Sequence, residues 1–189
     1  MFSQMKLAPR FLLAFLLLGL TPFALVSYLT LQKSEIALSA QAFNQLQGVR
    51  EIKKSQIEGF FSERFGDIVV LSRNDSVLAA LKAFAQSYDD NGKRVGGEAW
   101  NQAEAQFGPW LNHYQKEYGY YDLFLISKAG EVVYSAAKES DLGADLQRGK
   151  LKDSSLAEAF RQGLLQPVLV DFKPYAPSNN EPASFIAAP

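Results

Sequence analysis

The chain has 189 residues, of which 48% are hydrophobic and 21% are charged, a balance typical of a folded protein rather than a disordered one. Nineteen Lys and Arg against twenty Asp and Glu give a net charge of -1, so no excess of positive charge attracts nucleic acid. Cysteine is absent, which excludes disulfides, thiolate catalysis and cysteine metal sites. The single histidine, His113, is too few for a multi-histidine metal centre or most catalytic triads. We therefore expect no enzyme, no cofactor and no nucleic-acid partner.

An uncharged apolar segment occupies the first part of the chain. The 22 residues from Phe11 to Gln32 include no acidic or basic side chain, and most are Leu, Phe, Ala or Val. At a rise of about 1.5 Å per residue, such a helix spans roughly 33 Å, enough to cross the hydrocarbon core of a bilayer. Gly19 and Pro22 disfavour a soluble helix but are tolerated in a spanning one. The segment predicts a transmembrane helix over residues 11–32.

The charges that flank this segment predict its orientation. Lys6, Arg10 and the terminal amine precede it, whereas the residues that follow carry balanced charges. The positive-inside rule therefore places residues 1–10 in the cytoplasm and residues 33–189 outside.

Two alternatives for the apolar segment stay open. One is a cleaved signal peptide, with Ala40-Gln41-Ala42 as its small-residue cleavage site. The length of the apolar run opposes this interpretation, because signal cores usually have about 7–15 residues. The other alternative is a buried helix of a soluble protein.

A second helical pattern follows at once. Between Ser34 and Leu71 the apolar residues recur mostly three, four or seven positions apart, with Gln, Lys, Glu and Ser between them. A helix of this length cannot bury its apolar stripe alone, so we expect it to pair with a second copy or to pack along a domain. The alternative is two core helices broken near Gly48 or Gly59.

Two shorter helical features come next. Asn74-Asp75-Ser76 is typical of a helix N-cap, and Asp89–Gly92 is typical of a turn. From Glu98 to Tyr118 aromatic and apolar side chains recur at helical spacing, which favours a helix whose stripe packs in the core.

The period then changes from helix to strand. Residues 121–127 and 132–136 form a predicted hairpin around Gly130. A short helix over 156–165 and strands over 168–172 and 183–188 follow, with a loop between the last two strands. This order predicts an α+β domain in which helices pack on an antiparallel sheet.

Five segments of this region resemble a Cache domain, and together they are similar to the extracytoplasmic sensor of bacterial methyl-accepting chemotaxis proteins. The likeness covers the chain from about residue 118 to its end, and the anchor and long helix agree with it in kind. The segments are Tyr120–Ile126, Gly130–Tyr134, Ala137–Gly143, Val170–Ser178 and Glu181–Ala187.

The resemblance implies a PAS-like antiparallel sheet whose last strand lies centrally, between the first hairpin and the third and fourth strands. No such strand follows Ala187 in this sequence. We therefore expect unpaired strand edges on both sides of a gap, and a chain that is the N-terminal piece of a longer receptor or a truncated reading frame.

The function that the resemblance implies is the sensing of a small molecule by a membrane chemoreceptor. The domain would lie in the periplasm, anchored in the bacterial inner membrane by a single span, and would dimerise through the long helix. The parent receptor would act on a cytoplasmic histidine kinase. The alternatives are the sensor of a histidine kinase or cyclase, and a membrane-anchored envelope scaffold without a ligand.

Five polar residues are the candidates for ligand binding: Asp122, Tyr134, Lys138, Asp171 and Tyr175. Tyr134 and Lys138 are expected on one face of the second strand. Such a set can orient a carboxylate or an amine through charge-assisted hydrogen bonds. The sequence lacks the arginine, tryptophan and tyrosine pattern by which some Cache domains bind amino acids, which disfavours an amino-acid ligand.

Overall fold

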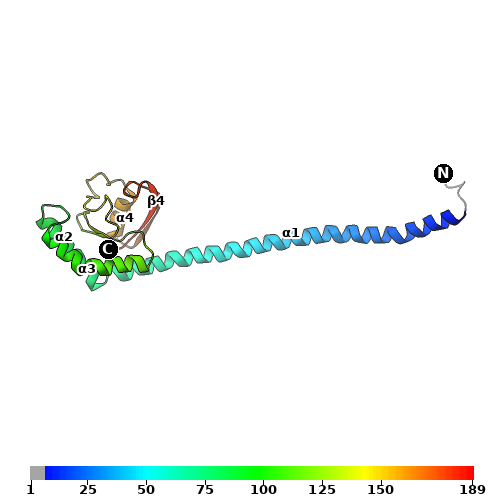
Figure 1. Cartoon of the computed structure of the whole chain (residues 1–189), viewed down its shortest axis with the longest axis horizontal. Helices are drawn as coiled ribbons and strands as arrows, with labels where there is room; N and C mark the ends of the chain where they lie inside the picture. The colour runs from blue at the N-terminus through cyan, green and yellow to red at the C-terminus, as the bar shows by residue number, and fades with distance from the viewer. Residues whose placement is uncertain (1–6) are drawn as a thin grey trace. The chain divides into compact units, whose positions relative to one another are not determined.

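The computed structural model describes residues 7–189 as two units, the first ending at Glu58 and the second spanning Gly59–Pro189. Residues 1–6, including Lys6 of the predicted cytoplasmic segment, lie outside the described part. The chain is mixed α+β, as predicted (Figure 1). Its elements are α1 (Leu7–Ser72), α2 (Asp75–Asp90), α3 (Glu98–Glu117), β1 (Phe124–Ile126), β2 (Val132–Ser135), α4 (Ser155–Gly163), β3 (Val168–Tyr175), the 3-10 helix η1 (Ala176–Ser178) and β4 (Glu181–Ala187).

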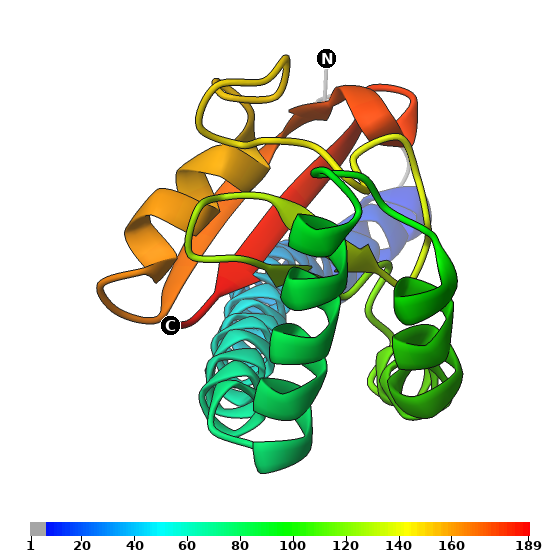
Figure 2. The same ribbon diagram turned by 90° about the vertical axis from the view of Figure 1, so that its left-hand side faces the viewer.

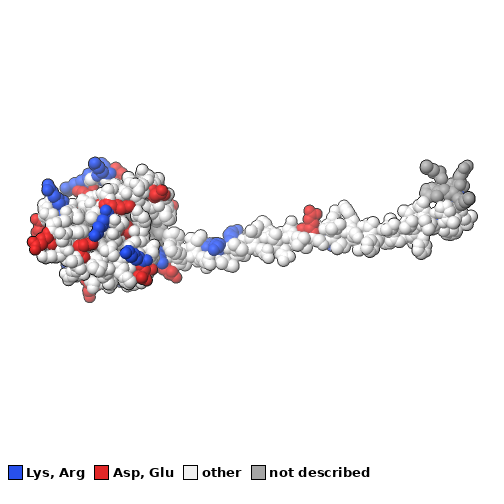
Figure 3. All heavy atoms as spheres, viewed as in Figure 1, with Lys and Arg blue, Asp and Glu red and all other residues white. Residues whose placement is uncertain are grey.

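α1 is one helix of 66 residues. The alternative of a break near Gly48 or Gly59 is wrong, because both residues lie within the helix and Pro22 does not end it either. Every described residue of α1 up to Phe60 is exposed, so the apolar side chains of the predicted span are not buried by any other part of residues 7–189. The stretch over 11–32 is white in Figure 3, since it has no charged residue. By length and composition α1 is able to cross a membrane.

α2 begins at the predicted cap. Oδ1 of Asn74 accepts hydrogen bonds from the backbone nitrogens of Ser76, at 2.9 Å, and Val77, at 3.3 Å. These bonds satisfy donors that the first turn of a helix leaves without partners, which explains why α2 starts here.

α3 covers the predicted range and continues through Pro109. Trp100, Ala103 and Leu111 are buried, which confirms that part of the aromatic and apolar stripe is core. Phe107 and Tyr114 are half-buried and pack against this core, whereas Trp110 and Tyr118 are 41% and 44% exposed.

The strands form two separate two-stranded antiparallel sheets, β1–β2 and β3–β4, rather than one sheet. Figure 2 shows β3 and β4 side by side with α4 beside them. β3 is longer than predicted: it continues to Tyr175 and includes Pro174, which was expected in a loop. Pro174 is tolerated there because β3 is an edge strand, where a missing backbone donor breaks no ladder on the outer side.

Two apolar clusters hold the second unit together. In the first, Phe84 of α2 packs against Trp100 of α3 and Tyr134 of β2, with ring centroids 5.4 and 4.9 Å apart. In the second, Phe160 of α4 and Tyr175 of β3 gather with other apolar residues. The β1–β2 hairpin contributes to both clusters, so the strands are buried from both sides.

Candidate functional site

A cleft of about 990 Å³ lies between the two sheets, and we refer to it as the cleft. β1 and β4 form two of its walls, α1 and α2 contribute Ile68, Leu71 and Leu81, and α4 contributes Leu156 and Phe160. Most of the lining is apolar. The volume lies at the upper end of the range typical of small-molecule sites.

Polar side chains gather where the segment before β1 meets η1. Glu139 accepts hydrogen bonds from the hydroxyls of Tyr121 and Ser178, the latter at 2.7 Å, and all three residues line the cleft. Asp122 and Tyr175 line it as well. The structure thus brings together two of the five predicted ligand residues.

Asp122 ties the entry of β1 to the exit of β2. Its Oδ2 accepts a hydrogen bond of 2.7 Å from Ser135, and its Oδ1 accepts one of 2.9 Å from the backbone of Ala137. Burial raises the pKa of the Asp122 carboxyl, although the hydrogen bonds from Ser135 and the backbone oppose this effect.

Tyr175 is 2% exposed and donates a hydrogen bond of 2.8 Å to Oδ2 of Asp141. The Asp141 side chain is fully buried, and its other carboxyl oxygen has no hydrogen-bond partner among the described residues. Burial raises the pKa of Asp141, and burial together with the nearby carboxyl groups raises the pKa of Tyr175. In both groups burial disfavours the charged form.

The structure places the other three predicted residues away from the cleft lining. Tyr134 is fully buried against α2, and its hydroxyl has no hydrogen-bond partner within residues 7–189. Asp171 is exposed and accepts a hydrogen bond from the backbone of Phe172. Lys138 does not share a strand face with Tyr134: β2 ends at Ser135, and Lys138 follows in a loop with a φ of 55°.

Lys138 pairs instead with α3. Its Nζ lies 2.7 Å from Oε1 of Glu104. The loop conformation directs the chain away from the strand, because a positive φ is incompatible with an extended ladder. The strand pattern that suggested a shared face does not extend to this residue.

Sequence reasoning missed Tyr121, Glu139 and Ser178. Each is polar and common at surfaces, and Tyr121 and Glu139 are 18 residues apart in the chain. The one sequence signal was that all three fall within the segments that resemble a Cache domain. Their proximity depends on the packing of η1 against the loop after β2.

One end of the cleft contacts α1 through aromatic rings. Tyr114 and Tyr120 line the cleft, and their rings lie 6.3 Å apart in a parallel arrangement. The guanidinium of Arg64 in α1 lies 5.1 Å from the centre of the Tyr120 ring. The Tyr120 hydroxyl is 3.2 Å from Oδ2 of Asp67, also in α1.

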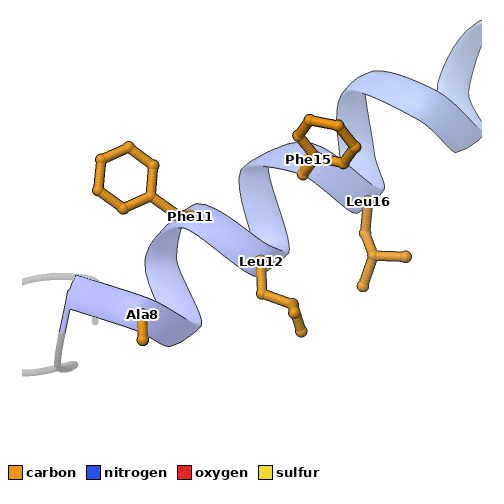
Figure 4. A pocket seen from close by; sticks show the side chains of 5 residues that line it. All are labelled: Ala8, Phe11, Leu12, Phe15 and Leu16. Atoms are coloured by element: carbon orange, nitrogen blue, oxygen red, sulfur yellow. The ribbon is translucent and has the colours of Figure 1, made fainter.

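A second hollow lies in the first unit, near the start of α1. Its lining residues are Ala8, Phe11, Leu12, Phe15 and Leu16, which all project from α1 (Figure 4). Because one exposed helix supplies every lining residue, this hollow is a helix surface suited to lipid contact rather than an enclosed site.

Comparison with protein-family models, with curated proteins and with solved structures gave no match. Within residues 7–189 no group of three or more His, Cys, Asp or Glu side chains is arranged to hold a metal ion. The cleft is therefore the candidate site on geometry alone.

Proposed function

We propose that this chain is the extracytoplasmic small-molecule-sensing part of a membrane chemoreceptor. One observation carries the proposal: Ile68, Leu71 and Ser72 of α1 line the cleft, and the same helix contains the apolar segment. A ligand in the cleft therefore contacts the element that enters the membrane. If this wall has two packings and the ligand binds one of them more tightly, the ligand shifts the population toward that packing.

The proposed anchor is residues 11–32, with the N-terminus in the cytoplasm of a bacterium and the second unit in the periplasm. The hydropathy and exposure of this stretch support a lipid environment, because exposed apolar surface of this extent is rare in water. Arg10 at its start supports the orientation.

The proposed fold is a PAS-like Cache sheet with a place for one more central strand. The contrast between the strand edges supports it. The outer strand β3 carries Asp171, Lys173 and Pro174 and an irregular register, devices that protect an exposed edge. The middle of β4, by contrast, is uncharged and lines the cleft, as does all of β1. Uncharged edges of this kind are suited to pairing with a further strand.

The proposed oligomer is a homodimer through α1. Phe43, Leu46 and Val49 are each more than half exposed, and they lie within one stretch of the helix. Burial of these side chains against a second copy would remove apolar surface from water. In the intact receptor, the dimer would pass the displacement to a cytoplasmic histidine kinase.

A thermal-shift screen of the full chain in detergent tests the sensor proposal. We expect at least one compound among organic acids, amines and amino acids to raise the melting temperature, since a ligand at 100 times its Kd stabilises by about 2.7 kcal/mol. Ala183→Trp, which fills the cleft, should abolish the shift, whereas Asp171→Asn, at an exposed site outside the cleft, should retain it. A screen without any shift would favour the ligand-free scaffold.

A further inference from the structure

We infer that Arg64, Asp67 and Tyr120 form a latch through which occupation of the cleft loosens the domain end of α1. The inference rests on the proposed function, because it names the residues by which that site would act on the helix. It concerns only the second unit, Gly59–Pro189.

The latch joins α1 to segments more than 50 residues away. Nη1 of Arg64 donates a hydrogen bond of 2.8 Å to the carbonyl oxygen of Tyr118 and lies 3.4 Å from Oδ2 of Asp67. The Tyr120 hydroxyl donates to the same carboxyl oxygen at 3.2 Å. Within residues 7–189, all side-chain hydrogen bonds between α1 and other elements involve Arg64 or Asp67. The polar attachment of α1 is thus concentrated at one point.

The guanidinium of Arg64 lies close to two aromatic rings. Its central carbon is 5.0 Å from the centre of the Phe60 ring and 5.1 Å from that of Tyr120. Cation–π contacts of this kind strengthen when water is excluded, and the side chain of Arg64 is only 17% exposed. Displacement of the Tyr120 ring would therefore remove one of the two cation–π contacts of Arg64.

Tyr120 belongs to the latch and to the cleft at once. Its ring lines the cleft, while its hydroxyl bonds Asp67. An occupant that pushes on the ring acts on Arg64 and Asp67 without an intermediary. Its ring lies 6.3 Å from that of Tyr114 and 6.4 Å from that of Tyr118, both in near-parallel arrangements.

The contacts of the latch leave one hydrogen-bond donor of Arg64 without an acceptor among the described residues. Nε of Arg64 is buried and has no hydrogen-bond partner in the part of the chain that the structure describes. A buried donor without a partner costs free energy, so the closed arrangement holds a smaller advantage over an open one than its contacts suggest. A small advantage is what a ligand needs in order to shift the balance.

Covalent filling of the cleft tests the latch without a known ligand. The chain has no cysteine, so Ala183→Cys on the cleft wall provides one attachment point for benzyl methanethiosulfonate. Hydrogen exchange of the full chain then reports on the amides of residues 59–72. Asp171→Cys, at an exposed position outside the cleft lining, carries the same group as a control.

We expect the benzyl group at position 183 to accelerate exchange over residues 59–72 by about fivefold or more, and the group at position 171 to have no effect. Arg64→Met should abolish the response, while Arg50→Met, which alters an exposed arginine of the same helix, should retain it. Tyr120→Phe keeps the ring but removes the bond to Asp67, so it should reduce the response and serves as the second variant if Arg64→Met does not fold.

Three results would overturn the latch, and they differ in what they say of the proposed function. An equal response with and without Arg64, or a filled cleft without any response, would overturn the latch and leave the cleft as a site. Failure of the reagent to reach position 183 in the folded chain would contradict both proposals, because the cleft would then be closed.

Discussion

The hydroxyl of Tyr175 in β3 lies 2.8 Å from a carboxyl oxygen of Asp141, which is 34 residues earlier in the chain. Both side chains are almost fully buried, and Tyr175 also borders the cleft. This hydrogen bond joins the β3–β4 sheet to the loop after β2, and so links the two sides of the candidate site.

Loss of the Tyr175 hydroxyl should destabilise the second unit. Tyr175→Phe removes the one hydrogen bond that a side chain of the described residues donates to Asp141, and a buried group without a partner costs about 1–3 kcal/mol. Urea unfolding measures the change. Tyr121→Phe is the control, because its hydroxyl bonds Glu139 from an exposed position and its loss should cost less. Equal losses would contradict the role of the buried pair.

The free energy of unfolding of the second unit should fall as the pH rises, because two of its carboxyl groups are buried. Burial raises the pKa of Asp141 and of Asp122 above 3.8, so the folded chain keeps protons that the unfolded chain releases. This stabilisation is complete below about pH 3.8 and declines as the pH rises through the folded-state pKa. Urea unfolding at a series of pH values should show a weaker decline in Asp141→Asn than in the native sequence. Parallel curves would refute the assignment.

The two tryptophans should differ sharply in their contribution to stability. Nε1 of Trp100 donates a buried hydrogen bond of 3.0 Å to the carbonyl oxygen of Val133, whereas Trp110 is 41% exposed. We expect Trp100→Phe to lower the free energy of unfolding by about 1–3 kcal/mol and Trp110→Phe to change it by less than about 0.5 kcal/mol. Thermal unfolding followed by circular dichroism compares them. A larger loss of stability in Trp110→Phe than in Trp100→Phe would contradict the assignment of Trp100 to the core face of α3.

Removal of the α2 cap should cost about 1 kcal/mol. Asn74→Ala deprives the backbone nitrogens of Ser76 and Val77 of their shared acceptor. Asn101→Ala is the matched control, because Asn101 is exposed within α3, where alanine favours the helix. The expected order of melting temperatures is Asn74→Ala below the native sequence and Asn101→Ala at or above it; a reversal would remove the capping role.

Local patterns were sufficient to predict most elements. The uncharged run predicted the apolar part of α1, and Asn74 predicted the start of α2, because both signals lie within a few residues of the feature they specify. The separation of the strands into two sheets was expected only from the resemblance. Strand patterning alone does not determine which edges pair.

The site was less predictable because long-range packing creates it. Tyr134 belongs to a strand whose four residues are all buried, so alternation could not indicate which face meets the cleft. Lys138 left the strand register because the chain turns after Ser135, whose hydroxyl accepts a hydrogen bond from the Lys138 backbone. The latch at Arg64 had no sequence signal, since its partners lie more than 50 residues away.

The proposed orientation places the second unit in the periplasm, and a thiol label tests it directly. Asp171→Cys places the only thiol of the protein at an exposed position of the second unit. Spheroplasts that express this variant are treated with a membrane-impermeant maleimide before and after permeabilisation. With the second unit in the periplasm, we expect full labelling of membrane-bound protein in intact spheroplasts. Labelling only after permeabilisation would place the second unit in the cytoplasm and contradict the proposed orientation.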